Sequence, residues 1–255
     1  MKNLLLLRVL LSVSLALTAT TNASPPPPPL SAQPQNQRPQ PEEGEDEPQP
    51  CPNLHIFGAR ETTSPPGFGS SSTLVDLVGR AFPGAGTTTT AEAIVYPAAG
   101  GPDYSASVTV GIAAVVKQTA AFAARCPRTV IIMHGYSQGA QIMDDAFCGG
   151  PDVPSLNSSV PLVSRQVAGN VAAIILMGSP RYVAGRKGNV GNATAGGFAA
   201  RPKDFRCPAF EDRIQTYCDS PDPFCSNGTD PDTHQGYGRV YGHQALAFIV
   251  SKLIL

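Results

Sequence analysis

A G-x-S-x-G pattern at residues 135–139 places Ser137 between two glycines. The apolar, β-branched run 129–133 precedes it, and a helical pattern over residues 140–147 follows. A strand, this motif and a helix together predict a nucleophile elbow, a turn so sharp that only small residues fit at the two glycine positions. Ser137 Oγ would then project from the carboxyl edge of a sheet, and the backbone N–H of Gln138 would point at a developing oxyanion. The alternative is a glycine-rich turn that merely contains serine, and both flanks favour the elbow.

A serine hydroxyl needs a base, and the chain has four histidines. His55 falls within an expected strand, His134 ends the strand before the elbow, and His243 falls within the last expected helix. His234 lies in a loop rich in Gly, Asp and Pro, after every expected strand. Serine hydrolases of this layout carry their base at that place, so we predict that His234 is the base.

The acid that orients this base should follow the last strand and precede His234. The candidates are Asp219, Asp222, Asp230 and Asp232. A disulfide between Cys218 and Cys225 would close a tight loop around Asp222 and could hold its carboxylate towards His234 Nδ1. Otherwise these aspartates simply make turns. We predict that Asp222 is the acid.

Apolar runs that alternate with helical patterns set the expected fold. The strands are expected at 54–57, 93–96, 129–133, 171–177 and 213–217, and the helices at 74–82, 105–125, 140–147 and 242–253, with loops over 149–166 and 184–200. Residues 70–73, all Ser or Thr, can cap the first of these helices. The alternation predicts a three-layer α/β/α sandwich around a central five-stranded parallel sheet. In such sheets the functional residues lie on loops beyond the carboxyl ends of the strands.

The N-terminal 50 residues differ from the rest. An apolar run from Leu4 to Leu17 followed by small residues predicts a signal peptide over 1–23, with cleavage near Ala23. A membrane anchor is the alternative, but the run is too short, and no later segment reaches about 18 apolar residues. Residues 24–50 are rich in Pro, Gln and acidic residues and predict a disordered extension. One domain is therefore expected over 51–255.

Charge and cysteine content limit the partners and the compartment. Three of the 18 Lys and Arg residues and five of the 19 Asp and Glu residues precede Cys51, so the expected domain has a net charge of +1. This near-neutral domain lacks the basic field that nucleic acid or an anionic membrane would require. Six cysteines behind a signal peptide predict disulfides, and the absence of C-x-x-C argues against zinc. Sequons at Asn157, Asn192 and Asn227 also indicate a secreted, extracellular protein.

Several strings in residues 51–255 carry a family resemblance. They are residues 51–52, 57–63, 135–139, 142–144, 148–150, 217–219, 222–223 and 233–238. On these strings the domain resembles the fungal acetylxylan esterases of the cutinase-like fold (carbohydrate esterase family 5). The resemblance implies Ser137 as nucleophile, His234 as base and Asp222 as acid. It also implies an oxyanion hole formed by Thr62 and the Gln138 N–H, with no metal or cofactor.

The resemblance also implies which cysteines pair. The pairs would be Cys51–Cys126, Cys148–Cys207 and Cys218–Cys225. Relatives often carry two further disulfides whose cysteines are missing here, and Ser226 stands in place of one of these cysteines. We therefore expect the loops around residues 100 and 192 to be less constrained than in those relatives. Phe224 stands where the esterases have a tyrosine near the acyl pocket, which bears on acyl-size selectivity.

Three functions are consistent with these features. The first is a secreted, monomeric serine esterase that removes acetyl groups from acetylated xylan through an acyl-enzyme. The second is a cutinase that acts on longer aliphatic esters, although strings 59–63 and 234–237 look like the esterase branch. The third is a non-catalytic secreted glycoprotein that uses this fold for binding, which the presence of Ser137, Asp222 and His234 argues against.

Overall fold

A computed structural model describes residues 50–82, 88–158 and 160–253. The predicted signal peptide and all but the last residue of the predicted extension lie outside these described residues. The strands are β1 (Leu54–Ala59), β2 (Thr89–Ala93), β3 (Val130–Tyr136), β4 (Val171–Met177), β5 (Asn189–Val190) and β6 (Ile214–Tyr217). They form one sheet in the order β2-β1-β3-β4-β6-β5, and every pairing is parallel. The sheet thus has six strands where the sequence predicted five.

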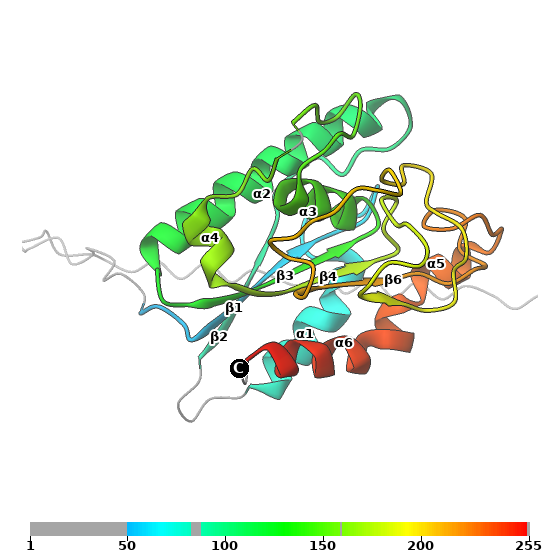
Figure 1. The fold of residues 1–255 in the computed structure, drawn as a ribbon. Coiled ribbons are helices and arrows are strands. Elements are labelled where there is room, and N and C mark those ends of the chain that lie inside the picture. Colours follow the sequence, from blue (N-terminus) through cyan, green and yellow to red (C-terminus); the bar gives the residue numbers. More distant parts are fainter. Residues whose placement is uncertain (1–49, 83–87, 159, 254–255) are drawn as a thin grey trace, which may run out of the picture. The chain divides into compact units, whose positions relative to one another are not determined.

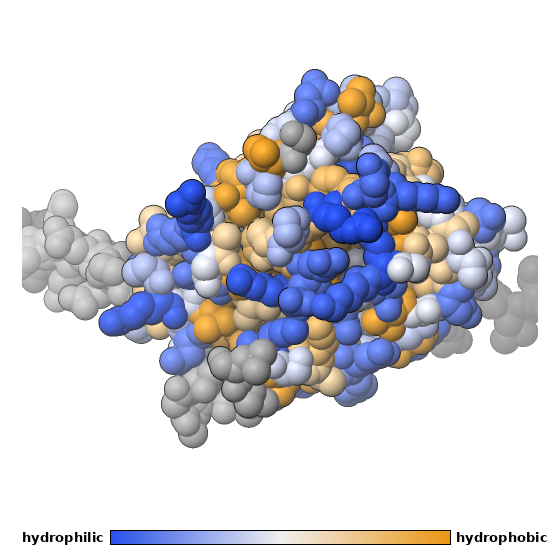
Figure 2. Space-filling model, in the orientation of Figure 1, coloured by the Kyte–Doolittle hydropathy of each residue, from blue (hydrophilic) through white to orange (hydrophobic). Residues whose placement is uncertain are grey.

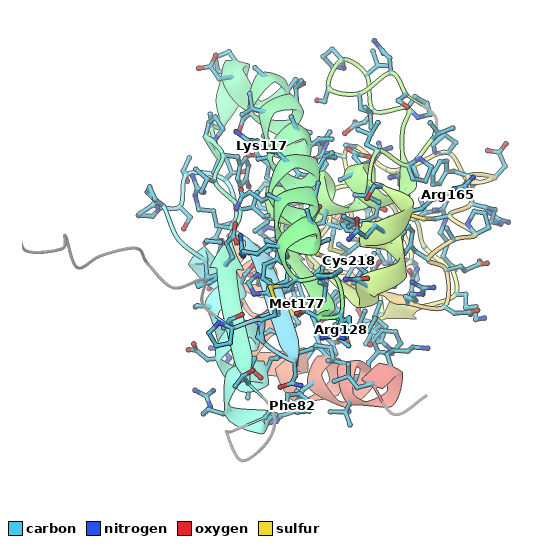
Figure 3. All side chains as sticks on the ribbon, turned by 90° about the vertical axis from the view of Figure 1, so that its left-hand side faces the viewer. Phe82, Lys117, Arg128, Arg165, Met177 and Cys218 are labelled. Atoms are coloured by element: carbon cyan, nitrogen blue, oxygen red, sulfur yellow. A yellow bond between two sulfur atoms is a disulfide. The ribbon has the colours of Figure 1, made fainter. Side chains whose placement is uncertain are left out.

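Helices cover both faces of this sheet (Figure 1). The α-helices are α1 (Ser72–Ala81), α2 (Tyr104–Arg125), α3 (Gln138–Cys148), α4 (Arg165–Asn170), α5 (Pro231–Gln235) and α6 (Tyr237–Leu253), with short 3-10 turns η1 (Gly69–Ser71) and η2 (Gly101–Asp103). Figure 1 shows α2, α3 and α4 above the sheet and α1 and α6 below it. The side view in Figure 3 places α2 and the red α6 on opposite sides as well. The predicted three-layer α/β/α sandwich is confirmed.

Side chains that alternate along the central strands build two cores. Phe57, Met133 and Leu176 pack beneath α2 and α3, whereas Ile132 and Ile175 face α1 and α6. Strands buried on both faces are expected to be continuously apolar, as residues 171–177 are. By length and composition, α2 together with η2 would suffice to span a membrane. In this structure α2 instead packs its apolar face on the sheet and α3.

Four local predictions differ from the structure. The strand expected at 93–96 ends at Ala93, because β2 runs over 89–93 on the exposed edge of the sheet. Ser71 does not cap α1: its hydroxyl donates to the Ala59 carbonyl at 2.7 Å and so joins the helix start to β1. The expected loops 149–166 and 184–200 contain the start of α4 and the two-residue β5. Such short elements carry no periodic signal.

Three disulfides join Cys51 to Cys126, Cys148 to Cys207 and Cys218 to Cys225. These are the pairs that the family resemblance implies. No free cysteine remains in the part of the chain that the structure describes. Such complete pairing fits an oxidising compartment outside the cytosol.

Candidate active site

Ser137 occupies the turn between β3 and α3 with φ 53° and ψ −117°, a backbone conformation that is strained for a non-glycine residue. Its amide donates to the Met177 carbonyl at the end of β4, at 2.8 Å. A Cβ at Gly135 would collide with the backbone of Gly139, and a Cβ at Gly139 would collide with the Ala59 carbonyl. The two glycines are therefore sterically required, as the elbow motif predicted.

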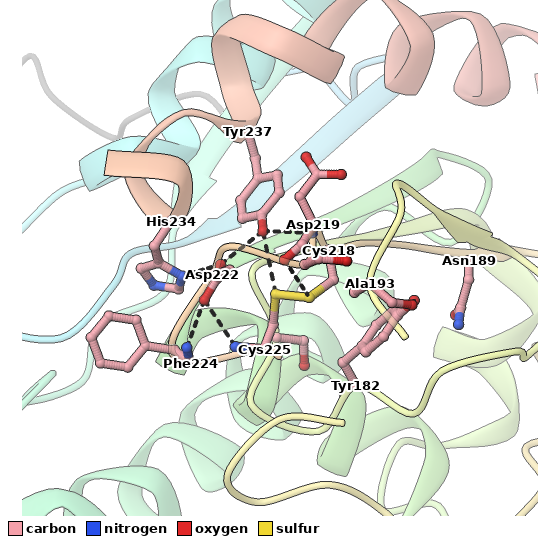
Figure 4. Close-up of a disulfide and its surroundings, with 12 residues drawn as sticks. Tyr182, Asn189, Ala193, Cys218, Asp219, Asp222, Phe224, Cys225, His234 and Tyr237 are labelled. Atoms are coloured by element: carbon pink, nitrogen blue, oxygen red, sulfur yellow. Dashed lines mark hydrogen bonds and ion pairs between the residues drawn. A yellow bond between two sulfur atoms is a disulfide. The ribbon is translucent and has the colours of Figure 1, made fainter. Parts of the chain in front are cut away.

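The distance from Nδ1 of His234 to Oδ2 of Asp222 is 2.7 Å, and both side chains are buried (Figure 4). It stands on the short helix α5 rather than in an open loop, which corrects the sequence prediction. Its ring packs on Gly178, where an added Cβ would lie 2.7 Å from Cε1. Since Gly178 follows Met177, the dipeptide at the end of β4 contacts both Ser137 and His234.

Ser137 and His234 are also connected through Tyr136. The Tyr136 hydroxyl donates to the His234 carbonyl at 2.6 Å and accepts from the Tyr237 amide at 3.2 Å. Within the described residues no hydrogen bond joins Ser137 Oγ to the imidazole, and neither Oγ nor Nε2 of His234 is a buried unpaired atom. Ser137 Oγ and His234 Nε2 are thus each accessible to solvent.

Four donors surround the fully buried carboxylate of Asp222. His234 Nδ1 and the Tyr237 hydroxyl contact Oδ2 at 2.7 and 2.8 Å, and the amides of Phe224 and Cys225 donate to Oδ1 at 2.6 and 3.0 Å. Burial acts to raise the pKa of Asp222, but the hydrogen bond and charge of His234 and the two amides bring it below its usual value. Asp222 is therefore an anion held in one position.

The other three aspartates have different partners. Asp219 accepts from the Tyr241 hydroxyl at 2.9 and 3.0 Å and from the Asn192 amide at 3.0 Å. Asp230 caps α5 by accepting from the Asp232 amide and the Thr233 hydroxyl. Asp232 is exposed in the first turn of that helix. Among the described aspartates, only Asp222 contacts the His234 side chain.

The remaining histidines lie elsewhere. His134 is fully buried under the elbow with Nδ1 3.1 Å from the Ile175 carbonyl, and burial lowers its pKa to about 4. His55 stacks on Phe122 with ring centroids 3.9 Å apart, and burial together with the charge of Arg125 lowers its pKa to about 4. His243 is exposed on α6.

Thr62 and Gln138, which the resemblance assigned to an oxyanion hole, both contact the loop 98–100. The Gln138 side chain donates to the Ala99 carbonyl at 2.9 Å, and its backbone N–H is among the first amides of α3, which lack an intrahelical partner. Thr62 is half-buried beyond β1, and a Cβ on Gly100 would lie 2.9 Å from its methyl group. One loop therefore positions both candidate donors.

Arg60 holds the turn that carries Thr62, a role that no sequence pattern predicted. Its buried guanidinium donates to the carbonyls of Ser64, Tyr96 and Pro97 at 2.9, 2.5 and 3.2 Å and lies over the Tyr96 ring. The Tyr96 hydroxyl returns a hydrogen bond to the Arg60 carbonyl at 2.6 Å. Buried cations need several such partners, so this arrangement fixes the turn beside the candidate site.

A buried ion network was also missed. Arg201 contacts Asp144 and Asp145 at 2.8 and 3.1 Å, and Arg181 contacts Asp145 and Asp152 at 3.1 and 3.3 Å. Burial and the neighbouring Asp152 raise the pKa of Asp145 to about 9, against the opposing effect of the two arginines. The partners come from α3 and from loops far along the chain, so local spacing could not reveal them.

Phe224 flanks the base with its ring centroid 4.5 Å from that of His234, and 40% of the residue is exposed. An apolar ring thus lies beside His234, at the position where the family resemblance implies a tyrosine. Ser226, where the family resemblance implies a cysteine, is buried with its hydroxyl unpaired. Across the described ranges, no group of three or more His, Cys, Asp or Glu residues is arranged to hold a metal ion.

Comparisons with known proteins give one consistent family. A family model described as cutinase matches residues 50–253. "Cutinase 11" of Verticillium dahliae is 54% identical over 80% of this chain and 70% of its own length, and "Acetylxylan esterase 2" of Talaromyces purpureogenus is 51% identical over 80% and 88%. The solved catalytic core domain of an acetyl xylan esterase from Trichoderma reesei is 47% identical, with a TM-score of 0.76, over 80% of this chain and all of that one.

Proposed function

The chain belongs to the cutinase family, and on that basis we propose that it is a secreted serine esterase that removes acetyl groups from acetylated xylan. The observation that carries the proposal is the 2.7 Å contact between His234 Nδ1 and a buried Asp222 carboxylate, next to a strained serine elbow. A carboxylate at Nδ1 selects the tautomer whose Nε2 can accept a proton.

In the proposed first step Ser137 Oγ attacks the acetyl carbonyl while His234 Nε2 takes its proton. Negative charge develops on the carbonyl oxygen, and donors from Thr62 and the Gln138 N–H would each stabilise it by ~3 kcal/mol. The sugar hydroxyl then leaves with the proton from His234. Asp222 stabilises the imidazolium throughout and is not itself protonated.

In the second step water attacks the acetyl-enzyme. His234 takes a proton from this water, and collapse of the tetrahedral intermediate releases acetate and regenerates the Ser137 hydroxyl. The predicted signal peptide and the three disulfides support secretion. We propose that exposed Asn157, Asn192 and Asn227 are glycosylation sites and that the enzyme is a monomer.

A second candidate is a cutinase that cleaves longer aliphatic esters. It is favoured by the 54% identity to "Cutinase 11" and by the apolar Phe224 ring beside His234. The deciding experiment compares acetate release from acetylated xylan, and hydrolysis of p-nitrophenyl acetate, with hydrolysis of p-nitrophenyl decanoate. Acetate release with a preference for the short ester is expected. A preference for decanoate without acetate release would favour the cutinase. If the protein hydrolyses no ester at all, the third function, a non-catalytic binding glycoprotein, would be favoured.

A further inference from the structure

A cavity of about 400 Å³ lies apart from the candidate catalytic residues, none of which lines it. Residues of segments 179–187 and 201–207 line it, together with residues of β5 and β6. Its wall includes the Cys148–Cys207 disulfide, which ties one of these segments to the end of α3. Figure 2 shows a hollow on this face surrounded by strongly hydrophilic residues.

Cationic side chains dominate the lining. They are Arg181, Arg186, Lys187, Arg201, Lys203 and Arg206, against the acidic side chains of Asp144 and Glu211. We call this cavity the basic pocket. A pocket that concentrates one sign of charge raises the local concentration of ligands of the opposite sign.

Half of these cations already have carboxylate partners. Arg181 and Arg201 belong to the buried ion network, and exposed Lys187 pairs with Asp212. The other three, Arg186, Lys203 and Arg206, form no ion pair in the part of the chain that is described.

Arg186 is the most constrained of the three. Its Nη2 donates to the Pro202 carbonyl at 2.7 Å, whereas its Nε is buried and lacks a hydrogen-bond partner. Burial also lowers the pKa of this guanidinium. A buried donor without a partner costs free energy that an incoming acceptor would recover.

One segment of chain connects the surroundings of His234 to the basic pocket. The Phe198 amide donates to the Phe224 carbonyl at 3.2 Å, and the Phe224 ring lies beside His234. Lys203, which lines the pocket, follows five residues later, so its Cα lies at most about 18 Å from that of Phe198.

We propose that the basic pocket binds the carboxylate of a uronic acid unit on the polysaccharide from which the enzyme removes acetyl groups. This inference rests on the proposed function for the polysaccharide. Guanidinium groups present paired N–H donors that match the two oxygens of a carboxylate, and a uronic acid unit carries such a carboxylate. The pocket would then select acidic regions of the substrate.

The test measures binding to the full chain carrying Ser137→Ala, so that the ligand is not turned over. Calorimetric titration compares a xylo-oligosaccharide bearing one glucuronate with the same oligosaccharide unsubstituted. We expect the glucuronate form to bind about tenfold more tightly, and 0.5 M salt to reduce the difference. In the background of Lys203→Ala with Arg206→Ala, the difference should fall below about threefold.

The matched control is Lys117→Ala with Arg128→Ala, which removes the same charge from exposed positions on α2 and just beyond its end (Figure 3). It should keep the full difference. Equal binding of the two oligosaccharides, or an equal loss in both double variants, would overturn the inference. So would inorganic phosphate that binds as tightly as the glucuronate form, because the pocket would then be a general anion site. Hydrolysis of p-nitrophenyl acetate by the wild type tests the proposed function separately.

Discussion

Tyr237→Phe is the most informative single change, because it removes one oxygen atom from the support of the candidate triad. That hydroxyl donates to Asp222 Oδ2 at 2.8 Å and accepts from the Asp219 amide at 2.9 Å. A hydrogen bond to a charged group contributes about 1.5–3 kcal/mol net. Three donors to Asp222 remain in the variant, so we expect part of this energy to be lost from the transition state. The expected fall in kcat/KM is about tenfold, or ~1.4 kcal/mol.

The separate effects on kcat and KM distinguish this positioning role from simple destabilisation. A carboxylate with one donor fewer holds the His234 ring less firmly, so the chemical step should slow while substrate binding is unchanged. With active sites counted by fluorophosphonate titration, kcat per active site for p-nitrophenyl acetate should therefore fall about tenfold in Tyr237→Phe, at an unchanged KM. A structural defect alone would lower the number of titrated active sites and leave kcat per active site at the wild-type value.

Tyr241→Phe is the matched control, one helical turn further along α6. Its hydroxyl donates to both oxygens of Asp219 and makes no contact with Asp222. We expect a free energy of unfolding lower by about 1 kcal/mol, with kcat per active site and KM within about twofold of the wild-type values. The reasoning is refuted if Tyr237→Phe keeps the wild-type kcat per active site, or if both variants lower it equally.

Three further predictions concern the elbow, the buried histidines and the small disulfide loop. Gly139→Ala should destabilise the fold by at least about 3 kcal/mol in urea titration and abolish ester hydrolysis, because the new methyl group meets the Ala59 carbonyl. Between about pH 6.5 and 4, stability should fall as pH falls, since His55 and His134 have pKa values of about 4 when folded and about 6.5 when unfolded. At pH 5 the two histidines together should lower the free energy of unfolding by up to ~4 kcal/mol. A free energy of unfolding that does not change between pH 6.5 and 4 would contradict this prediction. Replacing both cysteines of Cys218–Cys225 by alanine should lower the free energy of unfolding by ~2.5 kcal/mol, the contribution expected for so short a loop. The kinetics of p-nitrophenyl acetate hydrolysis should show a fall in kcat with a smaller change in KM.

The sequence predicted well where local steric rules act. The elbow depends on a strand, two glycines and a helix that adjoin in the chain, so residues 129–147 carried the whole signal. The order of elements then placed His234 and Asp222 beyond the last strand, and their contact follows from the fold. The position of β2 was wrong by several residues, because its threonines lie on an exposed edge where the apolar pattern is weak.

Other features depend on contacts between distant segments and have no local pattern. Arg201 and Asp144 are 57 residues apart, and their pairing depends on how the loops return over α3. Tyr136 lies within the G-x-S-x-G motif, yet its hydrogen bond to the His234 carbonyl spans 98 residues. The prediction of Asp222 rested on the expected Cys218–Cys225 loop around it, and in the structure the Asp222 carboxylate, not that of Asp219, contacts the imidazole.

The central claim is that His234, steadied by Asp222, activates the hydroxyl of Ser137. The most direct measurement is the rate and site of labelling by a fluorophosphonate, followed by intact-mass and peptide mass spectrometry. We expect one adduct per molecule on Ser137, none in Ser137→Ala, and labelling slowed by at least about 10³-fold in His234→Ala. An adduct on another residue, or a labelling rate that does not depend on His234, would contradict the account.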